Sequence, residues 1–384
     1  MKSKKIKKEY DLILIMGYFR SALPYLSIVK NLNHKKIGLV VYYGTEFYTK
    51  KVDQYSQEFI SLLIKEGAEI CLPKHILYTD LLLIQQHTYE EKFLSKISSI
   101  VKYKKAIALI GYRMGFRKND LFLKYFKVNT CVINDINIYN LLINKRDCKN
   151  IYSKYKILEV GLPYHKYPPF ETPKIDWLIA SPTTFSFDTE IEKNKYLRNI
   201  IKVINQIDSS KIIAYKQHNA DQKDYLKRYF LIVRYIPFPE KFAKIIEKIL
   251  PYSPFFFREK LYTLLSAIYQ KIILNRVICL SKLSEFSFLS VEAFIPNLNN
   301  GVIGGNSNTI WGTRFYNKKY LNCIEPLKIK QNDFKSKQTI GINLTYFGVP
   351  FCQNNINYEI KKDFKIFSDY EINIVDLIFK YLEK

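Results

Sequence analysis

The sequence predicts an α/β protein made of two Rossmann-like halves. Along most of its length, short apolar runs alternate with segments of helical periodicity, which is the pattern of a mostly parallel sheet with crossover helices. A proline-rich stretch interrupts this pattern near the middle of the chain. Hydrophobic residues make up 48% and charged residues 25% of the sequence, which is an ordinary globular composition and excludes a disordered chain.

Length and charge indicate the number of domains and the kind of partner the protein binds. A chain of 384 residues exceeds the size at which one hydrophobic core stops growing, so two domains are expected. Lys and Arg number 60 against 35 Asp and Glu, which gives a net charge of +25. This charge favours anionic partners: nucleic acid, anionic lipid, sugar nucleotides or acidic glycans. An AT-rich genome that favours Lys, Asn, Ile and Tyr is the alternative explanation.

The first half contains five predicted strands, each a short apolar run: Asp11–Gly17, Ile37–Tyr43, Ala68–Leu72, Ala106–Gly111 and Asn129–Ile133. After the first of them, Tyr25, Val29 and Leu32 recur at helical spacing, and a second helical stripe ends at Gly67. No GxGxxG motif follows any strand, so this half is Rossmann-like without the dinucleotide-binding fingerprint.

A boundary between domains is predicted in residues 161–173, which contain four prolines and one glycine. A second αβ series follows, with strands predicted at Asp176–Ala180, Lys211–Tyr215, Val277–Leu280, Gly301–Gly304 and Tyr320–Ile324. A closing helix at Asp369–Leu382 is expected to pack back on the first half. The predicted domains are residues 1–165, residues 166–350 with a helical insertion at about 238–276, and a C-terminal segment of residues 351–384.

The spacing of the six cysteines and five histidines does not support a metal site or a disulfide framework. No CxxC, HExxH or HxH motif occurs, so we expect no zinc site and a reduced, cytoplasmic protein. No Asp-x-Asp motif occurs either, so a transferase that chelates a metal through such a pair is not expected. We predict no metal and no cofactor.

Polar residues that directly follow predicted strands are the candidates for chemistry, because ligands of doubly wound sheets bind beyond the carboxyl ends of the strands. Asp135 follows the strand Asn129–Ile133, where a carboxylate can deprotonate an acceptor hydroxyl. Capping of the next helix is the alternative role for Asp135.

The second candidate segment, Lys216–Asn219, follows the predicted strand Lys211–Tyr215. His218 can donate a proton to the phosphate of a leaving nucleotide, or hydrogen-bond it, and Lys216 adds positive charge. A solvated loop histidine is the alternative.

The third candidate segment, Gly301–Thr309, is a strand followed by small, amide and hydroxyl residues that begin a helix. Backbone N–H groups at such a helix start, with the hydroxyl groups of Ser307 and Thr309, can hold a phosphate. The GKS/T of a P-loop is absent, which disfavours nucleoside triphosphate hydrolysis. A glycine-rich turn with a helix cap is the alternative.

The order of these segments, with Glu292 ahead of the third, resembles that of the bacterial GT-B sialyltransferases, namely the lipooligosaccharide sialyltransferase and capsule polysialyltransferase families. The resemblance implies an acceptor-binding first domain and a donor-binding second domain that face a cleft. It implies that Asp135 is the general base and that His218 is the general acid, which also binds the CMP phosphate. The donor-binding residues that it implies are Lys216, Asn219, Glu292, Gly305, Asn306, Ser307, Asn308 and Thr309.

Two positions depart from the family pattern: Ile136 follows Asp135 where the family has glycine, and Asn219 follows His218 where it has proline. The implied reaction is metal-independent, inverting transfer of a sialic acid-like sugar from a CMP donor to a cell-surface glycan. A Kdo or polyol-phosphate transferase of the same fold is an alternative. A non-enzymatic nucleic-acid-binding protein is another, suggested by the charge and the 15% of aromatic residues, although no RNP, helix-turn-helix or zinc-knuckle pattern supports it.

The insertion at about 238–276 is basic and amphipathic. Its apolar residues repeat at helical spacing, and Phe255, Phe256 and Phe257 form an aromatic tip. Between residues 241 and 276, seven Lys and Arg stand against Glu247 and Glu259. Because such helices bind anionic membrane surfaces, we predict peripheral attachment to the inner face of the membrane through the three phenylalanines. Ordinary packing on the second domain is the alternative.

Overall fold

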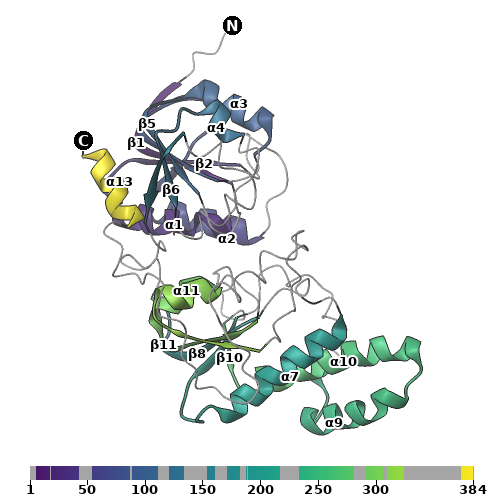
Figure 1. Ribbon diagram of the computed structural model, residues 1–384. Helices are drawn as coiled ribbons and strands as arrows, with labels where there is room; N and C mark the ends of the chain where they lie inside the picture. Colours follow the sequence, from purple (N-terminus) through teal and green to yellow (C-terminus); the bar gives the residue numbers. More distant parts are fainter. Residues whose placement is uncertain are drawn as a thin grey trace. The chain divides into compact units, whose positions relative to one another are not determined.

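The computed structural model describes residues 6–17, 19–42, 54–86, 89–110, 121–133, 154–160, 171–181, 187, 189–216, 233–280, 291–305, 309–323 and 373–383. The chain divides into two compact units, Met1–Glu171 with Phe367–Lys384, and Thr172–Ile366. Each unit contains a parallel sheet with helices packed on it (Figure 1). The predicted α/β class and the two Rossmann-like units are therefore confirmed. The division after Glu171 falls within the proline-rich stretch.

The first unit is built on a seven-stranded sheet of order β3-β2-β1-β4-β5-β6-β7. Its strands are β1 (Ile6–Met16), β2 (Ile37–Val41), β3 (Ala68–Ile70), β4 (His75–Gln85), β5 (Val101–Leu109), β6 (Thr130–Ile133) and β7 (Lys156–Glu159). Its helices are α1 (Phe19–Asn31), α2 (Gln54–Lys65), α3 (Glu91–Ile100), α4 (Phe122–Tyr125) and α13 (Ile374–Leu382).

Two strands of this sheet, β4 and β7, are not predicted by the sequence analysis. β4 lies at the centre of the sheet, where it pairs with both β1 and β5. Thr79 and Asp80 interrupt its apolar residues, and β7 begins and ends with charged residues, so neither strand is a continuous apolar run. Their places in the sheet follow from the register with neighbouring strands rather than from local hydrophobicity.

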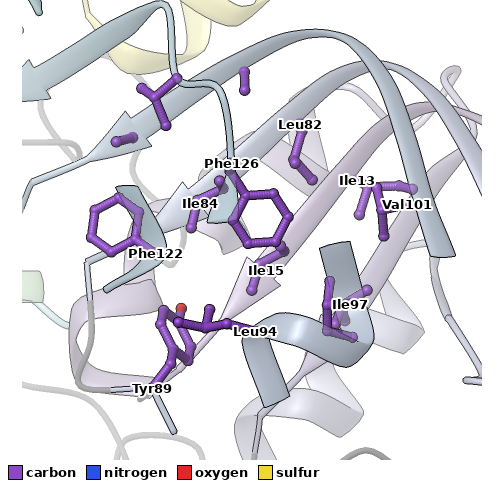
Figure 2. Packing of buried hydrophobic residues seen from close by; sticks show 14 of the residues in the cluster. Ile13, Ile15, Leu82, Ile84, Tyr89, Leu94, Ile97, Val101, Phe122 and Phe126 are labelled. Carbon is purple, nitrogen blue, oxygen red and sulfur yellow. The ribbon is translucent and has the colours of Figure 1, made fainter. Parts of the chain in front are cut away.

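One hydrophobic cluster of the first unit lies between the sheet and helices α3 and α4 (Figure 2). Ile13 and Ile84 contribute from β1 and β4, and Leu94 and Ile97 from α3. The buried residues of α3 recur at helical spacing, so one stripe of the helix covers the sheet. Each such side chain contributes roughly 1.5–3 kcal/mol when it is fully buried.

The C-terminal helix α13 belongs to the first unit, where it packs against α1 and β4. The side chain of Asn373 caps its start by accepting hydrogen bonds from the N–H groups of Val375 at 2.9 Å and Asp376 at 3.0 Å. Near its end, the Tyr381 hydroxyl lies 2.9 Å from Thr130 Oγ1 of β6. These contacts hold the last described residues of the chain on the first sheet.

The second unit is built on a five-stranded sheet of order β10-β9-β8-β11-β12. Its strands are β8 (Ile175–Ala180), β9 (Ile213–Lys216), β10 (Ile278–Cys279), β11 (Leu298–Gly304) and β12 (Lys319–Asn322). Its helices are α7 (Glu190–Gln206), α9 (Pro239–Ile249), α10 (Phe255–Leu274) and α11 (Thr309–Phe315), with short 3-10 turns η3 (Leu250–Tyr252), η6 (Val291–Ala293) and η7 (Ile295–Asn297). Gly301 allows β11 to approach β12, because a Cβ there would lie 2.0 Å from the Lys319 carbonyl oxygen.

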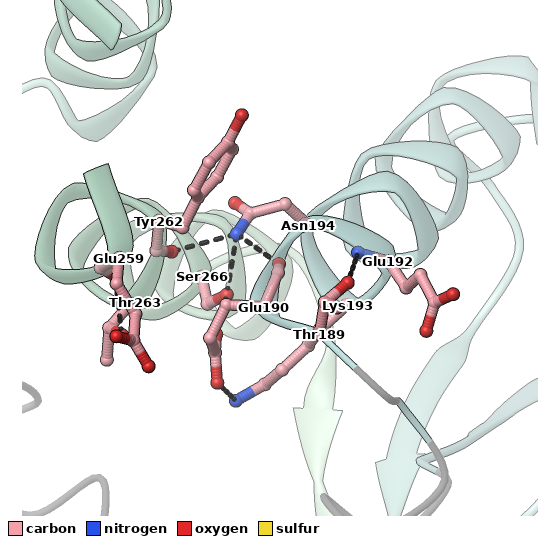
Figure 3. Close-up of polar contacts among 9 residues, drawn as sticks. All are labelled: Thr189, Glu190, Glu192, Lys193, Asn194, Glu259, Tyr262, Thr263 and Ser266. Carbon is pink, nitrogen blue, oxygen red and sulfur yellow. Dashed lines mark hydrogen bonds and ion pairs between the residues drawn. The ribbon is translucent and has the colours of Figure 1, made fainter. Parts of the chain in front are cut away.

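A polar cluster joins α7 to α10 (Figure 3). The Asn194 Nδ2 donates to the Tyr262 carbonyl at 2.8 Å and to Ser266 Oγ at 2.9 Å. Ser266 in turn donates to Glu190 at 2.8 Å, and Lys193 lies 3.4 Å from the same carboxylate. Because these groups are part-buried and bonded to one another, they fix the position of α10 on α7.

Candidate functional site

The carboxyl edge of the second sheet brings four residues into one row. Lys216 at the end of β9 pairs with Ala180 of β8, and Gly304 of β11 pairs with Asn322 of β12. β11 and β8 are joined by the pair Ile303 and Ile179, one position earlier, which sets Gly304 level with Ala180. Residues at the same level of parallel strands present their side chains to the same face of a sheet. We refer to Lys216, Ala180, Gly304 and Asn322 as the Lys216 row.

The Lys216 row lies on the face of the sheet that α11 covers. The neighbouring residues Ile179, Tyr215 and Ile303 point the other way, into the core that includes residues of α7 and α10. α11 packs against β11 and β12, and it lies on the opposite side of the sheet from α7 and α10 (Figure 1). The turn η6, which carries Glu292, packs against α11. Glu292 and Thr309, the first residue of α11, therefore belong to the same layer as the row.

The polar residues of this layer are buried. Lys216 and Asn322 are 0% exposed, Thr309 is 2% exposed and Glu292 is 5% exposed. Removing an ammonium or carboxylate group from water costs several kcal/mol unless another polar group compensates it. All four residues are engaged in polar or electrostatic interactions. Buried charges at the carboxyl edge of a doubly wound sheet are characteristic of a ligand site.

Tyrosine hydroxyls hold the backbone at the two small residues of the row, and Gly304 leaves the space that one of them uses. A Cβ at Gly304 would lie 2.6 Å from the Tyr320 hydroxyl, which donates to the carbonyl of Gly305. From α7, Tyr196 donates to the Ala180 carbonyl at 3.3 Å. Burial raises the pKa of the Tyr196 hydroxyl well above its usual value, so this group remains a protonated donor. The backbone is thus fixed where the predicted phosphate-binding segment begins.

Four of the predicted catalytic and donor-binding residues lie in the described part of the chain, and all four belong to the second unit. Lys216 ends β9, Glu292 lies in η6, Gly305 follows β11 and Thr309 begins α11. The other predicted residues, namely Asp135, His218, Asn219, Asn306, Ser307 and Asn308, lie outside the described residues. The strand that precedes Asp135 in the sequence, β6, ends at Ile133, and the strand that precedes His218 and Asn219, β9, ends at Lys216.

Two polar residues of this layer, Tyr320 and Asn322, are not among those predicted from the sequence. Both lie in the predicted strand Tyr320–Ile324, and both are 0% exposed. An asparagine inside an apolar run at the end of a strand is the signal that could have identified Asn322, because a buried amide needs hydrogen-bond partners. Tyr320 gave no such signal, since tyrosine is common in strands.

The carboxyl edge of the first sheet differs in its described part, where neutral groups hold the backbone. The Gln85 side chain accepts a hydrogen bond from the Gly17 N–H at 2.7 Å, and Tyr89 donates to the Gln85 carbonyl at 2.8 Å. Tyr42 accepts a hydrogen bond from the Glu90 N–H at 3.1 Å. These contacts stabilise the loops that follow β1 and β4.

A cavity of 680 Å³ lies in the amino-terminal half of the first sheet, away from its carboxyl edge. Residues 9–11 of β1, 78–80 of β4 and 102–104 of β5 line it, together with Lys36. Two of its carboxylates have partners within the fold: Asp80 lies 2.6 Å from Lys104, and Asp11 accepts the backbone N–H of Lys36 at 2.7 Å. The cavity therefore does not coincide with any predicted site residue.

Metal ligands do not gather in the described parts of the chain, where no group of three or more His, Cys, Asp or Glu residues could hold an ion. Cys71, Cys131, Cys279 and Cys323 are present as thiols and not as disulfides. Among the helices that the structure describes, none combines the length and apolar character needed to cross a membrane.

Comparison with known proteins finds similarity only among solved structures. No protein-family model matches the sequence, and no curated protein matches it. A UDP co-structure of MnaA from S. aureus is 11% identical and has a TM-score of 0.40, with 82% of this chain and 78% of that chain covered. A UDP-N-acetylglucosamine 2-epimerase structure from Listeria monocytogenes is 12% identical with a TM-score of 0.41, covering 83% and 79%. A UDP-glucosyltransferase from Polygonum tinctorium is 7% identical with a TM-score of 0.42, covering 90% and 83%.

Proposed function

We propose that this chain is a nucleotide-sugar-dependent glycosyltransferase whose donor binds at the carboxyl edge of the second sheet. The observation that carries the proposal is the Lys216 row with its covering layer. A fully buried lysine, a buried glutamate and a buried hydroxyl group belong to the layer at the carboxyl edge of the second sheet, where doubly wound sheets bind ligands. A folded protein retains buried charges at a cost, and ligand binding is the use that fits this location.

The chemistry of glycosyl transfer fits these groups. When the bond from the sugar to the nucleotide breaks, negative charge develops on the departing phosphate. The Lys216 ammonium and the Thr309 hydroxyl can stabilise this charge by hydrogen bonding, and a charged donor makes the stronger bond. The remainder of the mechanism rests on the sequence: His218 protonates or hydrogen-bonds the phosphate, and Asp135 removes the proton of the acceptor hydroxyl.

For the donor and acceptor, we propose a CMP-linked, sialic acid-like sugar transferred with inversion to a cell-surface glycan. This proposal rests on the motif order that the sequence shares with the sialyltransferases. Single displacement needs only a base on the acceptor side and a stabilised phosphate on the donor side. The donor panel that tests it includes CMP-, CDP-, UDP- and GDP-linked sugars, with CMP-linked Kdo among them.

Donor binding can be followed in the second unit alone. Both tryptophans of the chain, Trp177 and Trp311, belong to this unit, so their fluorescence reports its unfolding. A donor at about 100 times its Kd stabilises the state that binds it by about 2.7 kcal/mol, and we expect a nucleotide sugar to raise the unfolding midpoint accordingly. The proposal fails if no donor of the panel raises the midpoint and filter binding instead shows salt-dependent affinity for nucleic acid.

A matched pair of variants on α11 separates binding from folding. Thr309→Val removes the hydroxyl assigned to the phosphate, and Thr313→Val removes a hydroxyl one turn further along the same helix, where the residue is also buried. We expect Thr309→Val to weaken donor binding about tenfold and Thr313→Val to leave it unchanged, since a hydrogen bond to a charged group contributes about 1.5–3 kcal/mol. Equal effects of the two variants on donor binding would mean that Thr309 has a structural role and does not bind the donor.

Turnover then tests the two sequence-derived roles. Asp135→Asn should lower kcat about 10²-fold or more while donor affinity stays within a few-fold, because the amide cannot accept the proton. His218→Ala should lower transfer by a similar factor. Turnover like that of the wild type in either variant would remove that residue from the mechanism.

A further inference from the structure

Helix α9 carries two adjacent apolar stripes, and the fold buries only one of them. Pro239, Ala243 and Ile246 are buried, and the neighbouring helix α10 packs against α9. The second stripe precedes the first by one residue at each turn, and its members are exposed: Phe238 (68%), Phe242 (42%), Ile245 (51%), Ile249 (51%) and, in η3, Tyr252 (89%). A single buried stripe would suffice to hold α9 on the protein, so the second stripe has no role in that packing.

The charges of α9 are sorted around the exposed stripe. At roughly 100° per residue, Lys241, Lys244 and Lys248 form a row on the side of the exposed stripe away from α10. Glu240 and Glu247 lie on the opposite side of the helix, where the fold engages them. Glu240 is 3.4 Å from Arg276, and Glu247 accepts a hydrogen bond from Tyr269 and lies 3.8 Å from Arg198. The surface beside the exposed stripe is therefore basic.

The three phenylalanines predicted from the sequence extend this apolar surface. Phe255, Phe256 and Phe257 begin α10 and are 89%, 69% and 49% exposed. They follow α9 across the short turn η3, at the end of the α9–α10 hairpin that projects away from the sheet of its unit (Figure 1). We call the exposed stripe and these three phenylalanines the hairpin surface. Its exposed apolar side chains all lie within residues 238–257, unlike the scattered exposed apolar residues of an ordinary surface.

The structure also separates the basic residues that serve the fold from those that border the hairpin surface. The Lys271 ammonium donates to the carbonyls of Val233 and Ile236 at 2.8 Å each. Arg258 donates to the carbonyls of Ser253 at 2.8 Å and Pro251 at 3.0 Å. The lysines of α9 are exposed instead, so their row supplies positive charge beside the hairpin surface.

From these observations we infer that the hairpin surface binds an anionic lipid surface, with α9 lying in the interface plane. An apolar stripe bordered by lysines matches the layers of a bilayer surface: acyl chains take the aromatic and aliphatic side chains, and anionic headgroups meet the ammonium groups. A second copy of the chain fits less well, because a symmetric contact through this surface brings two lysine rows together. No residue of the hairpin surface belongs to the Lys216 row, so the inference is independent of the proposed transferase activity.

The test is co-sedimentation of the full-length chain with vesicles. We expect binding to vesicles of phosphatidylglycerol and phosphatidylcholine, and little binding to phosphatidylcholine alone. Phe242→Ser, Ile245→Ser and Ile249→Ser combined should weaken binding about tenfold or more, since the acyl region loses its apolar partners. The control combines Ile64→Ser, Ile191→Ser and Ile212→Ser, which remove exposed isoleucines elsewhere and should leave binding unchanged.

A series of charge variants measures the electrostatic contribution to vesicle binding. Lys241→Gln, Lys244→Gln and Lys248→Gln combined should reduce binding at low salt and flatten its salt dependence, because exposed charges are screened within a Debye length. Lys92→Gln, Lys195→Gln and Lys202→Gln remove the same charge from other exposed positions and should have a small effect. The inference is overturned if the wild type ignores anionic vesicles, or if both charge variants lose binding equally. It is also overturned if sedimentation without lipid shows a dimer that the α9 serine variant dissociates.

Discussion

The first strand pairs of the two sheets share one backbone arrangement. In the first unit, Asp11 accepts the backbone N–H of Lys36 at 2.7 Å and donates its own N–H to the Lys36 carbonyl at 2.9 Å. In the second unit, Asp176 makes the same two bonds to Ile212, at 2.8 Å and 2.9 Å. In each case the aspartate lies on the first strand, and its partner directly precedes the second strand. The aspartate thus sets the register of the pair in both units.

The same register shows where the two units differ. Ile15 follows Asp11 by the same number of residues as Ala180 follows Asp176. Ile15 pairs with Val40 in the first unit, and Ala180 pairs with Lys216 in the second. Both Val40 and Lys216 are 0% exposed. The first unit has an apolar side chain at this position of the strand pair. The pairing itself therefore does not require a lysine. The donor site that we propose gives the charge at the second edge a role that strand pairing does not.

The largest expected effect comes from moving the charge into the first unit. Val40→Lys places an ammonium group in an apolar core and should destabilise the first unit by more than about 4 kcal/mol. Hydrogen exchange in peptides from β1 and β4 measures this loss. Ile64→Lys, on α2 at a position that is 46% exposed, is the control and should change exchange little. Normal protection in the Val40 variant would mean that the two positions are equally suited to a lysine.

The reverse change should affect binding. Lys216→Met gives the second edge the apolar character of the first, and we expect donor affinity to fall roughly 10- to 100-fold, because a charged hydrogen bond contributes about 1.5–3 kcal/mol. Lys193→Met is the matched control, since Lys193 is a buried lysine of the same unit that contacts Glu190 on α7. Calorimetric titration of the donor checks both. Unchanged affinity in the Lys216 variant would contradict the role of the row.

The smallest expected effect concerns the shared aspartate. The Ile212 N–H, with Asn299 and Lys211, holds the pKa of the Asp176 carboxyl below its usual value. A lowered folded-state pKa adds stability above the unfolded pKa of about 3.9, and this stability is lost as the pH falls through the folded pKa. Asp176→Asn should therefore lower the tryptophan-monitored urea midpoint at about pH 6, and its difference from the wild type should shrink below about pH 4. Asp11→Asn lies in the first unit and should not move that midpoint.

Elements with a local apolar pattern could be predicted from the sequence, whereas those that depend on long-range strand pairing could not. Strands such as β1 and β8 are apolar runs next to helical stripes, so their existence could be read from the sequence, although β1 begins at Ile6 and not near Asp11. β4 could not be read in this way, because Thr79 and Asp80 break its pattern and its place depends on pairing with β1 and β5. Lys216 could be singled out because a charged residue directly followed a predicted strand. Tyr320 could not be singled out in this way, because its importance depends on the register of β12 with β11.

The sequence by itself determined the two αβ series, the division between them and the polar segments that follow strands, because periodicity, proline content and residue order are local properties. Only the tertiary structure decided that Lys216 is fully buried in a row with Asn322, and that α9 buries one apolar stripe while exposing the next. The sequence shows apolar residues in both stripes of α9. Which of them meets α10 depends on how the hairpin folds back on itself, since burial is a property of two surfaces in contact and not of either one alone.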